Sequence, residues 1–178
     1  MLVYPWLDGE LLNHATRSGS GVRTEPTSPF ARFRALPVRR VEAVLGALLD
    51  AHIAVAAAGF VAVDLYDGSF MYDFLTHRFR LIDLDEYRPG PFVTHRRLPG
   101  SRRFMAPEEY GGGSIDERTT VFVLGRAIRL LLDAGDSEQG WRGNEGQLAV
   151  VEGATQTAPD QRIRTVTALR DTWNRATS

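Results

Sequence analysis

Apolar residues recur every three or four positions after Pro37, which is the spacing of one face of an α-helix. This face comprises Val38, Val41, Val44, Leu45, Leu48, Leu49 and His52. Proline is favourable at the first position of a helix, because its missing N–H would have no partner there, and glycine commonly ends one. The pattern therefore predicts a long amphipathic helix that begins at Pro37 and ends near Gly59.

A second amphipathic helix is predicted from residue 117 to 132, with Asp116 as its N-cap. Its apolar face consists of Val121, Leu124, Ile128, Leu131 and Leu132. Two further helical stretches are predicted at about 144–156 and 162–176, because Pro159 interrupts the pattern between them. The C-terminal part of the chain is therefore expected to be mostly helical.

The middle of the chain contains short runs of β-forming residues instead. Strands are predicted at 69–74 and 78–84, and the short turn between them indicates a hairpin. Nearer the N-terminus, Asp8 is expected to cap a short helix, and residues 16–30 are rich in Gly, Ser, Thr and Pro, which is typical of a loop. Together the elements predict one domain of the mainly α (α+β) class with one small central β-hairpin.

The composition narrows the classes of protein to which the chain can belong. Its 178 residues, 43% hydrophobic and 24% charged, suit one globular domain. The absence of cysteine excludes disulfides and thiolate metal sites, and the formal net charge of −1 argues against a nucleic-acid partner. All 21 basic residues are arginine, so any reaction that needs a lysine from this chain is excluded.

No targeting or membrane signal is visible in the sequence. The N-terminus has neither the basic region nor the apolar core of a signal peptide. The longest apolar stretch, 53–63, has 11 residues, whereas a membrane-spanning helix needs about 20. We therefore expect a cytoplasmic protein that has no membrane partner.

Carboxylates gather at the two ends of the predicted hairpin. Asp64 and Asp67 come just before it, and Asp83 and Asp85 come at its exit. Because the ends of a hairpin lie side by side, we expect these carboxylates to converge. Such a group suits Mg²⁺, which prefers oxygen ligands, and a remaining carboxylate can accept a proton from an attacking hydroxyl. The alternative is that the aspartates only stabilise turns and helix ends.

Several motifs follow one another along the chain in a distinctive order. They are Asp64, Asp83, the run GSRRFMAPE at 100–108, the run VFVLG at 121–125 and the run APDQR at 158–162. This order resembles the C-terminal lobe of eukaryotic-type serine/threonine protein kinases, in a divergent bacterial kinase-like form. The run at 100–108 is the most specific part, because it is similar to the family pattern G-[ST]-x-x-[YF]-M-A-P-E.

The resemblance implies a fold and a division of the chain. Residues 1–178 are expected to form one protein-kinase-like C-lobe, a helical bundle with the hairpin at its centre and with the N-lobe absent. Within it, 1–8 is a hinge-like segment, 60–108 contains the catalytic loop, hairpin and activation segment, and 109–178 is a helical subdomain.

The resemblance also implies how ATP and Mg²⁺ are bound. Tyr4 and Trp6 of the hinge-like segment are the expected nucleotide contacts. Asp83 matches the family's metal-binding aspartate, and Ser69 stands where the family has a metal-binding asparagine. Serine is a weaker oxygen ligand, so Asp67 is a candidate to take its place.

Four further residues receive catalytic or structural roles from the resemblance. Asp64 matches the catalytic-loop aspartate, which acts as base and orients the substrate hydroxyl. Ser101 matches a residue that helps to position the catalytic loop. Glu108 is expected to form an ion pair with Arg162 that is costly to break if it is buried, by about 3–5 kcal/mol.

The sequence also departs from the family pattern. Residues 62–64 read Ala-Val-Asp where the family has His-Arg-Asp, and Tyr66 replaces a lysine. Asp85 replaces the glycine after the metal-binding aspartate, and Thr120 replaces the aspartate that normally holds the catalytic loop. No glycine-rich loop precedes Tyr4. We therefore expect the chain alone to be inactive or weakly active, with a separate N-lobe or a second chain as partner at the exposed hinge face.

Three functional hypotheses follow. The leading one is an ATP- and Mg²⁺-dependent serine/threonine protein kinase-like protein that transfers phosphate to the hydroxyl of a protein substrate. The second is a pseudokinase that serves as a protein-binding module, which the replaced motif residues favour. The third is a small-molecule phosphotransferase of the aminoglycoside or choline kinase type; residues 81–84 fit it, whereas the motif at 105–108 does not.

Overall fold

The computed structural model describes residues 8–14 and 23–177, and it has a mixed α+β fold. The helices of this part are α2 (Pro29–Arg34), α3 (Val38–Ala57), α4 (Glu117–Leu131), α5 (Glu145–Ala154) and α6 (Val166–Thr177). The strands are β1 (Glu10–Leu11), β2 (Phe60–Val61), β3 (Phe70–Asp73), β4 (Arg78–Leu81), β5 (Arg88–Pro89), β6 (Phe92–Thr94) and β7 (Gly113–Ile115). Single 3₁₀ turns are η1 (Asp67–Ser69), η2 (Pro107–Tyr110) and η3 (Pro159–Gln161). Tyr4 and Trp6 lie outside the described residues.

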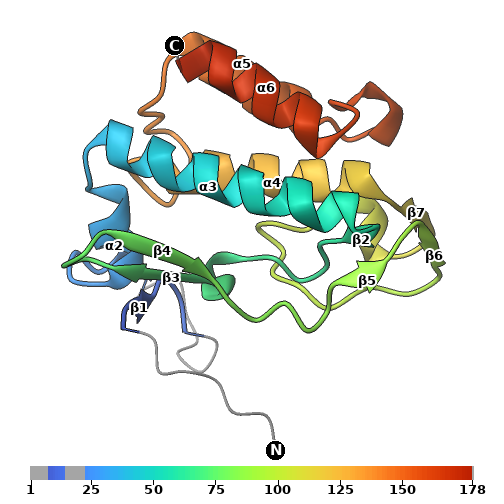
Figure 1. Cartoon of the computed structure of the whole chain (residues 1–178), viewed down its shortest axis with the longest axis horizontal. Helices are drawn as coiled ribbons and strands as arrows, with labels where there is room; N and C mark the ends of the chain where they lie inside the picture. The colour runs from blue at the N-terminus through green and yellow to red at the C-terminus, as the bar shows by residue number, and fades with distance from the viewer. Residues whose placement is uncertain (1–7, 15–22, 178) are drawn as a thin grey trace, which may run out of the picture.

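The elements form two layers (Figure 1). In the helical layer α5 and α6 lie over α3 and α4, and α3 packs against α6 while α4 packs against α5. The small sheets and their connecting loops lie on the other side of α3 and α4. The loops after β2 and β4, which carry Asp64 and Asp83, belong to this second layer.

The two long helices confirm the sequence prediction closely. α3 begins one residue after Pro37, and Gly59 lies just beyond its end with a φ of 78°, a left-handed conformation that glycine adopts without strain. The N-cap of α4 is Asp116, whose carboxylate accepts a hydrogen bond from Arg118 N at 2.8 Å. Both helices are stabilised by the burial of the apolar face that their spacing predicts. In α3 the fully buried residues include Val41, Leu45, Leu48 and Leu49.

The predicted hairpin is present, although it is not the only sheet. β3 and β4 pair antiparallel with Phe70 opposite Leu81 and Asp73 opposite Arg78. β1 extends this hairpin to three strands, and two further antiparallel pairs, β2 with β5 and β6 with β7, hold the loops around it. These extra strands have only two or three residues each, which is too short for a period-2 pattern to be visible.

The prediction of a short helix after Asp8 is wrong. Residues Glu10–Leu11 form β1 and pair with Met71 and Tyr72 of β3. The backbone N–H of Leu12 donates to Phe70 O at 2.9 Å, and the Leu12 side chain is 2% exposed. Pairing with a sheet edge and burial of one leucine therefore outweigh the weak local preference for a helix.

Two helix boundaries also differ from the prediction. α2 begins inside the predicted loop, where Ser28 caps it by accepting a hydrogen bond from Ala31 N at 3.1 Å. α6 begins at Val166 rather than at residue 162, because Arg162 is extended (φ −76°, ψ 159°) and its side chain bonds to other segments. The Ser28–Pro29 pair was a visible helix-start signal, whereas the extended Arg162 was not.

Candidate functional site

Asp64 and Asp83 occupy matching places at the ends of short strands. Asp64 comes three residues after β2, and Asp83 comes two residues after β4. Both have a backbone in the left-handed region, with φ of 59° and 58°. Aspartate tolerates this region better than most residues, yet such conformations are uncommon and concentrate at functional sites. His77 and Glu138 share this conformation, so Asp64 and Asp83 are two of four such non-glycine residues in the described part of the chain.

The carboxylate of Asp64 lies in the negative field of two other carboxylates. Burial, together with the negative charges of Asp83 and Glu86, raises the pKa of Asp64 to about 6. Asp64 is partly buried, whereas Asp83 is exposed. A carboxylate whose pKa is near 6 is ionised at neutral pH and is a stronger proton acceptor than an ordinary aspartate.

The loop at 100–101 closes one side of the site. Gly100 has a φ of 146°, and a Cβ added there would lie 2.9 Å from Met105 Cγ and 3.8 Å from Asp64 Oδ1. A side chain at Gly100 would thus be strained and would clash with Met105, while Asp64 Oδ1 lies at ordinary contact distance. Ser101 follows directly, and its carbonyl accepts hydrogen bonds from Phe104 N and Met105 N at 2.9 and 3.1 Å. The structure therefore brings the 100–101 loop next to the carboxylate of Asp64.

The backbone before Asp64 is anchored to α4. Ala62 and Val63 are both fully buried. The N–H of Ala62 donates to Thr120 Oγ1 at 3.0 Å. Thr120, which the resemblance matches to a loop-holding aspartate, thus bonds the segment that leads to Asp64 through its hydroxyl.

Two candidate Mg²⁺ ligands fit the site, namely Asp83 and Ser69. Ser69 is fully buried, and its Oγ has no hydrogen-bond partner in the structure. The Ser69 carbonyl accepts from Ile82 N at 2.9 Å, so Ser69 lies beside the residue that precedes Asp83. The Ser69 hydroxyl and the exposed carboxylate of Asp83 are therefore the oxygen donors that this pair of neighbouring segments offers to Mg²⁺, which keeps several of its waters.

Asp67 does not fit the role of metal ligand. It is fully buried; its Oδ1 accepts a hydrogen bond from Asn13 Nδ2 at 3.0 Å, and its Oδ2 lies 2.9 Å from Arg23 Nε. Both oxygens therefore face protein donors, and we assign Asp67 a structural position. Among residues 8–14 and 23–177, no three His, Cys, Asp or Glu side chains converge as a metal site.

Glu108 and Arg162 form the ion pair that the resemblance implies. Arg162 Nη1 and Nη2 donate to Glu108 Oε1 and Oε2 at 2.7 and 2.8 Å, and the side chains are 0% and 7% exposed. Thr119 Oγ1 donates to the same Glu108 Oε1 at 2.8 Å. The Arg162 guanidinium also donates to the carbonyls of Arg118, Gln156 and Thr157. This pair ties η2 to the segment before α6.

The sequence analysis gave Tyr66 and Glu86 no role at the site. Burial raises the pKa of Tyr66, and the charges of Asp64 and Asp83 add to this shift, so its hydroxyl stays protonated at neutral pH. Glu86 contributes to the raised pKa of Asp64 and forms an ion pair with Arg88. The position of Glu86 three residues after Asp83 was a usable signal, since the chain turns there.

Comparisons with known proteins leave the family open. No protein-family model matches the chain, and no curated protein resembles it closely enough to count as a relative. In the described part of the chain, no helix is both long enough and apolar enough to cross a membrane.

Proposed function

We propose that this chain is the C-terminal lobe of a protein-kinase-like protein that transfers the terminal phosphate of ATP to a protein hydroxyl. The observation that carries the proposal is the proximity of two aspartates, Asp64 and Asp83, which both have a left-handed backbone. The negative charge of Asp83 helps to raise the pKa of Asp64 to about 6. The pair of Glu108 with Arg162 and the bond from Ala62 to Thr120 support the same proposal, because both connect the positions that the resemblance selects.

The residues divide the chemistry between them. When bound, Mg–ATP supplies the phosphoryl group, and the metal neutralises the charge that develops on it. Asp83 and the free Ser69 Oγ are the side chains that would hold the metal. Asp64 would accept the proton of the substrate hydroxyl.

The proposed role of Asp64 predicts a pH dependence. A general base must be deprotonated, and the pKa of Asp64 is about 6. Phosphotransfer is therefore expected to fall as the pH drops through about 6, with an otherwise flat profile up to pH 8. A profile that is flat down to pH 4.5 would remove Asp64 from this role.

Nucleotide binding is the first experiment, because it does not require the chain to be active. We expect isothermal titration calorimetry to detect binding of ATP that requires Mg²⁺. Asp83→Asn should abolish the Mg²⁺ dependence, whereas the control Asp85→Asn, an exposed carboxylate two residues later, should retain it. Equal effects of the two substitutions would contradict the assignment of Asp83.

Phosphotransfer is the second experiment. Wild-type chain and an Asp64→Asn variant are incubated with radiolabelled ATP and a protein acceptor, alone and together with any N-lobe partner. We expect the variant to bind Mg–ATP normally and to lose transfer by at least 100-fold, in the range that is typical of a positioned acid–base group. An Asp64→Asn variant as active as wild type would refute the catalytic assignment.

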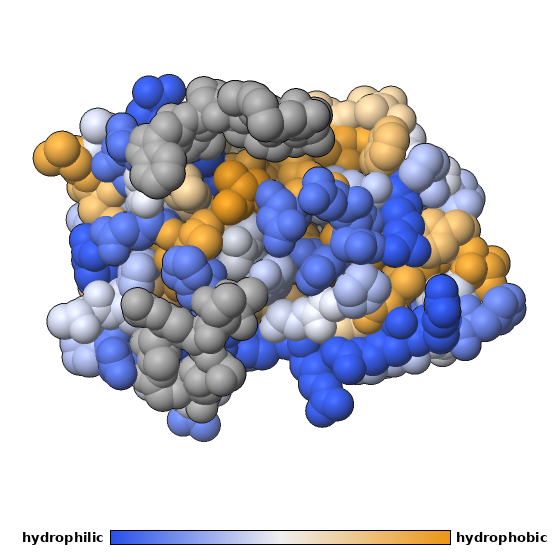
Figure 2. All heavy atoms as spheres, turned by 90° about the horizontal axis from the view of Figure 1, so that it is seen from below, coloured by the Kyte–Doolittle hydropathy of each residue, from blue (hydrophilic) through white to orange (hydrophobic). Residues whose placement is uncertain are grey.

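A partner on the nucleotide-facing side is part of the proposal. Leu84, next to Asp83, is 38% exposed. The segment between β4 and β5 runs along the lower side of the molecule in Figure 1, which is the side viewed in Figure 2. Apolar side chains lie among charged ones on that face. We expect a separate N-lobe or a second chain to cover it.

A pseudokinase that acts as a protein-binding module is the second candidate. The observation that favours it is the engagement of Asp67 with Arg23 and Asn13, which removes one of the three candidate ligands for a metal. This candidate predicts that the chain binds no Mg–ATP in the titration above while it still forms a complex with its protein partner.

A further inference from the structure

A row of basic side chains without acidic partners lies between β6 and η2. His95, Arg96, Arg97 and Arg102 are all exposed, and together we call them the basic surface. Within residues 8–14 and 23–177, none of the four forms an ion pair with a carboxylate. The acidic residues that follow in η2 do not compensate this charge, because Glu108 is paired with Arg162 and Glu109 is buried.

The backbone of this segment is held in place by bonds at several points. Leu98 N donates to Glu109 O at 2.8 Å, and Gly112 N donates to Thr94 O at 2.9 Å. Thr94 Oγ1 donates to Arg96 O at 2.6 Å and closes the turn. Leu98 is 7% exposed and anchors the middle of the segment. The basic surface is thus displayed on an ordered support, which lowers the entropic cost of binding.

The basic surface adjoins the candidate site. Arg97 and Arg102 flank Gly100, and Arg97 Nη2 donates to Gly100 O at 3.3 Å. Gly100 is the residue whose added Cβ would lie 3.8 Å from Asp64 Oδ1. A chain segment that places a hydroxyl at Asp64 would therefore extend over these arginines.

A partly apolar groove accompanies the charges. A cavity of about 460 Å³ is lined by the apolar residues Phe92, Val93 and Leu98 and by the polar residues Arg88, Thr94, His95 and Arg96. Val93 is 63% exposed, so this floor is open to a ligand. The groove therefore fits an apolar side chain that lies close to acidic ones.

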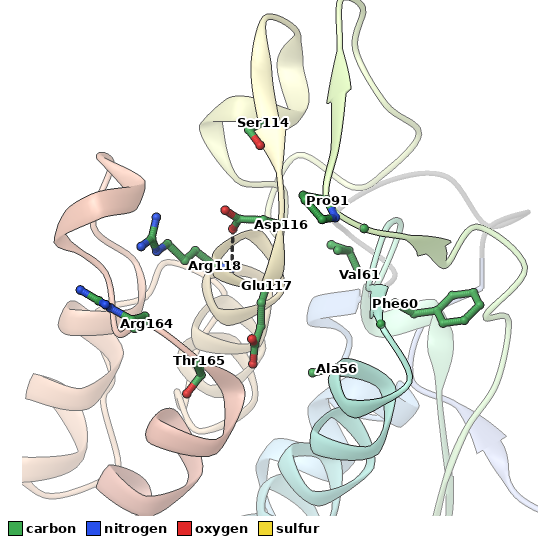
Figure 3. Close-up of a pocket in the computed structure, with 12 residues that line it drawn as sticks. Ala56, Phe60, Val61, Pro91, Ser114, Asp116, Glu117, Arg118, Arg164 and Thr165 are labelled. Carbon is green, nitrogen blue, oxygen red and sulfur yellow. Dashed lines mark hydrogen bonds between the residues drawn. The ribbon is translucent and has the colours of Figure 1, made fainter.

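A second groove on the molecule has no excess of positive charge and therefore does not favour an acidic ligand. A cavity of about 470 Å³ near the starts of α4 and α6 contains Asp116, Glu117, Arg118 and Arg164 (Figure 3). Two carboxylates and two guanidinium groups balance one another there. Asp116 and Glu117 also accept hydrogen bonds from Arg118 N and Val166 N, so they help to build the walls. That groove does not favour an anion, whereas the basic surface does.

We propose that the basic surface and its apolar groove dock an acidic polypeptide segment that carries an apolar side chain, and that this segment belongs to the substrate. That the segment belongs to a substrate rests on the proposed function. Docking of the segment does not, because binding requires no phosphoryl transfer. Exposed guanidinium groups recognise carboxylates through paired N–H donors, and the positive field also speeds the encounter.

The test is a binding measurement without nucleotide. The probe is a fluorescent ten-residue peptide with one serine, one leucine and several glutamates, and its counterpart has glutamine at every glutamate. We expect the full chain to bind the glutamate peptide at least tenfold more tightly at low salt, and the preference to shrink at 0.5 M salt because exposed charges are screened.

Two matched variants locate the surface. Arg96→Gln with Arg102→Gln should weaken binding of the glutamate peptide about five- to tenfold and leave the glutamine peptide unaffected. The control, Arg39→Gln with Arg40→Gln, removes the same charge from the start of α3 and should have no effect. Thermal unfolding at the wild-type temperature establishes that both variants fold.

The outcomes separate this inference from the proposed function. Equal affinity for the two peptides, an equal loss in the control variant, or equally tight binding of single-stranded DNA would overturn the docking surface. Failure to bind Mg–ATP would overturn the proposed kinase function alone, and the preference for the glutamate peptide would then identify a binding module for acidic segments.

Discussion

Glu109 offers a direct test of the electrostatics around the candidate site. It lies in η2 with 1% of its surface exposed, and its Oε2 accepts a hydrogen bond from Ala106 N at 2.6 Å. Burial is the largest cause that raises its pKa, the bond from Ala106 opposes the shift, the charges of Glu108 and Asp64 add to it, and the net pKa is about 8. At neutral pH the folded protein therefore holds Glu109 mainly as the neutral acid.

The expected effect on stability follows from the difference between folded and unfolded pKa. The ordinary value is 4.5 and the folded value is about 8. Each unit of difference corresponds to about 1.4 kcal/mol, so the contribution reaches about 5 kcal/mol. Because the folded pKa is raised, this stability is fully present below pH 4.5. It declines as the pH rises and is lost above about 8.

A Glu109→Gln variant measures this contribution. The amide has the shape of the neutral acid and keeps an oxygen to accept from Ala106 N. Urea unfolding at pH 5, 7 and 8.5 should show an advantage of the variant that is below about 1 kcal/mol at pH 5 and grows to several kcal/mol at pH 8.5. Glu152→Gln, an exposed position in α5, is the control and should show no trend.

Two results would refute the reasoning. If the difference between Glu109→Gln and wild type is the same at all three pH values, the pKa of Glu109 is not raised in the folded state. If the variant is less stable at pH 8.5, the ionised carboxylate has a stabilising partner.

Three further predictions concern buried polar contacts. Arg162→Met should lower the free energy of unfolding by about 3–5 kcal/mol, because Glu108 is left buried and unpaired. Adding Glu108→Gln in a double-mutant cycle should restore part of the lost stability. If the effects of the two substitutions simply add, the pairing is contradicted. Burial lowers the pKa of His52 to about 4, so the stability of the wild type should fall as the pH drops from 6.5 to 4. Urea titrations of a His52→Gln variant should not show this fall, and the same fall in the variant would rule out His52 as its cause. Thr120→Val should cost about 1–3 kcal/mol by removing the acceptor of Ala62 N, and Thr120→Ser should cost clearly less; equal losses would deny the hydrogen bond its role.

Elements with a strong local pattern were predictable from the sequence. The spacing of apolar residues located α3 and α4, and an aspartate or a proline marked where each begins. The β3–β4 hairpin was predictable for the same reason. β1 was not, because its two residues form a strand only through pairing with β3, a contact that is distant in the chain.

The sequence predicted which residues belong to the candidate site, but not which side chains contact one another there. Motif order selected Asp64, Asp83, Glu108 and Arg162. It could not reveal that Arg23, more than 40 residues upstream, sits against Asp67 and removes it from the set of free carboxylates. It also gave no sign that Ser69 Oγ is buried without a partner. Both facts depend on which side chains meet across loops.

The contact between Thr120 and Ala62 shows how the segment before Asp64 is held without a charged side chain at position 120. An aspartate at position 120 would need donors for both of its oxygens in a buried place, and alanine at 62 offers no side-chain donor. A threonine hydroxyl accepts the one backbone N–H that is present, at 3.0 Å, and carries no charge to bury. The anchor of the loop thus depends on a backbone group that every residue at position 62 except proline supplies. For this reason the side chain at position 62 can vary without loss of the bond that holds the segment before Asp64.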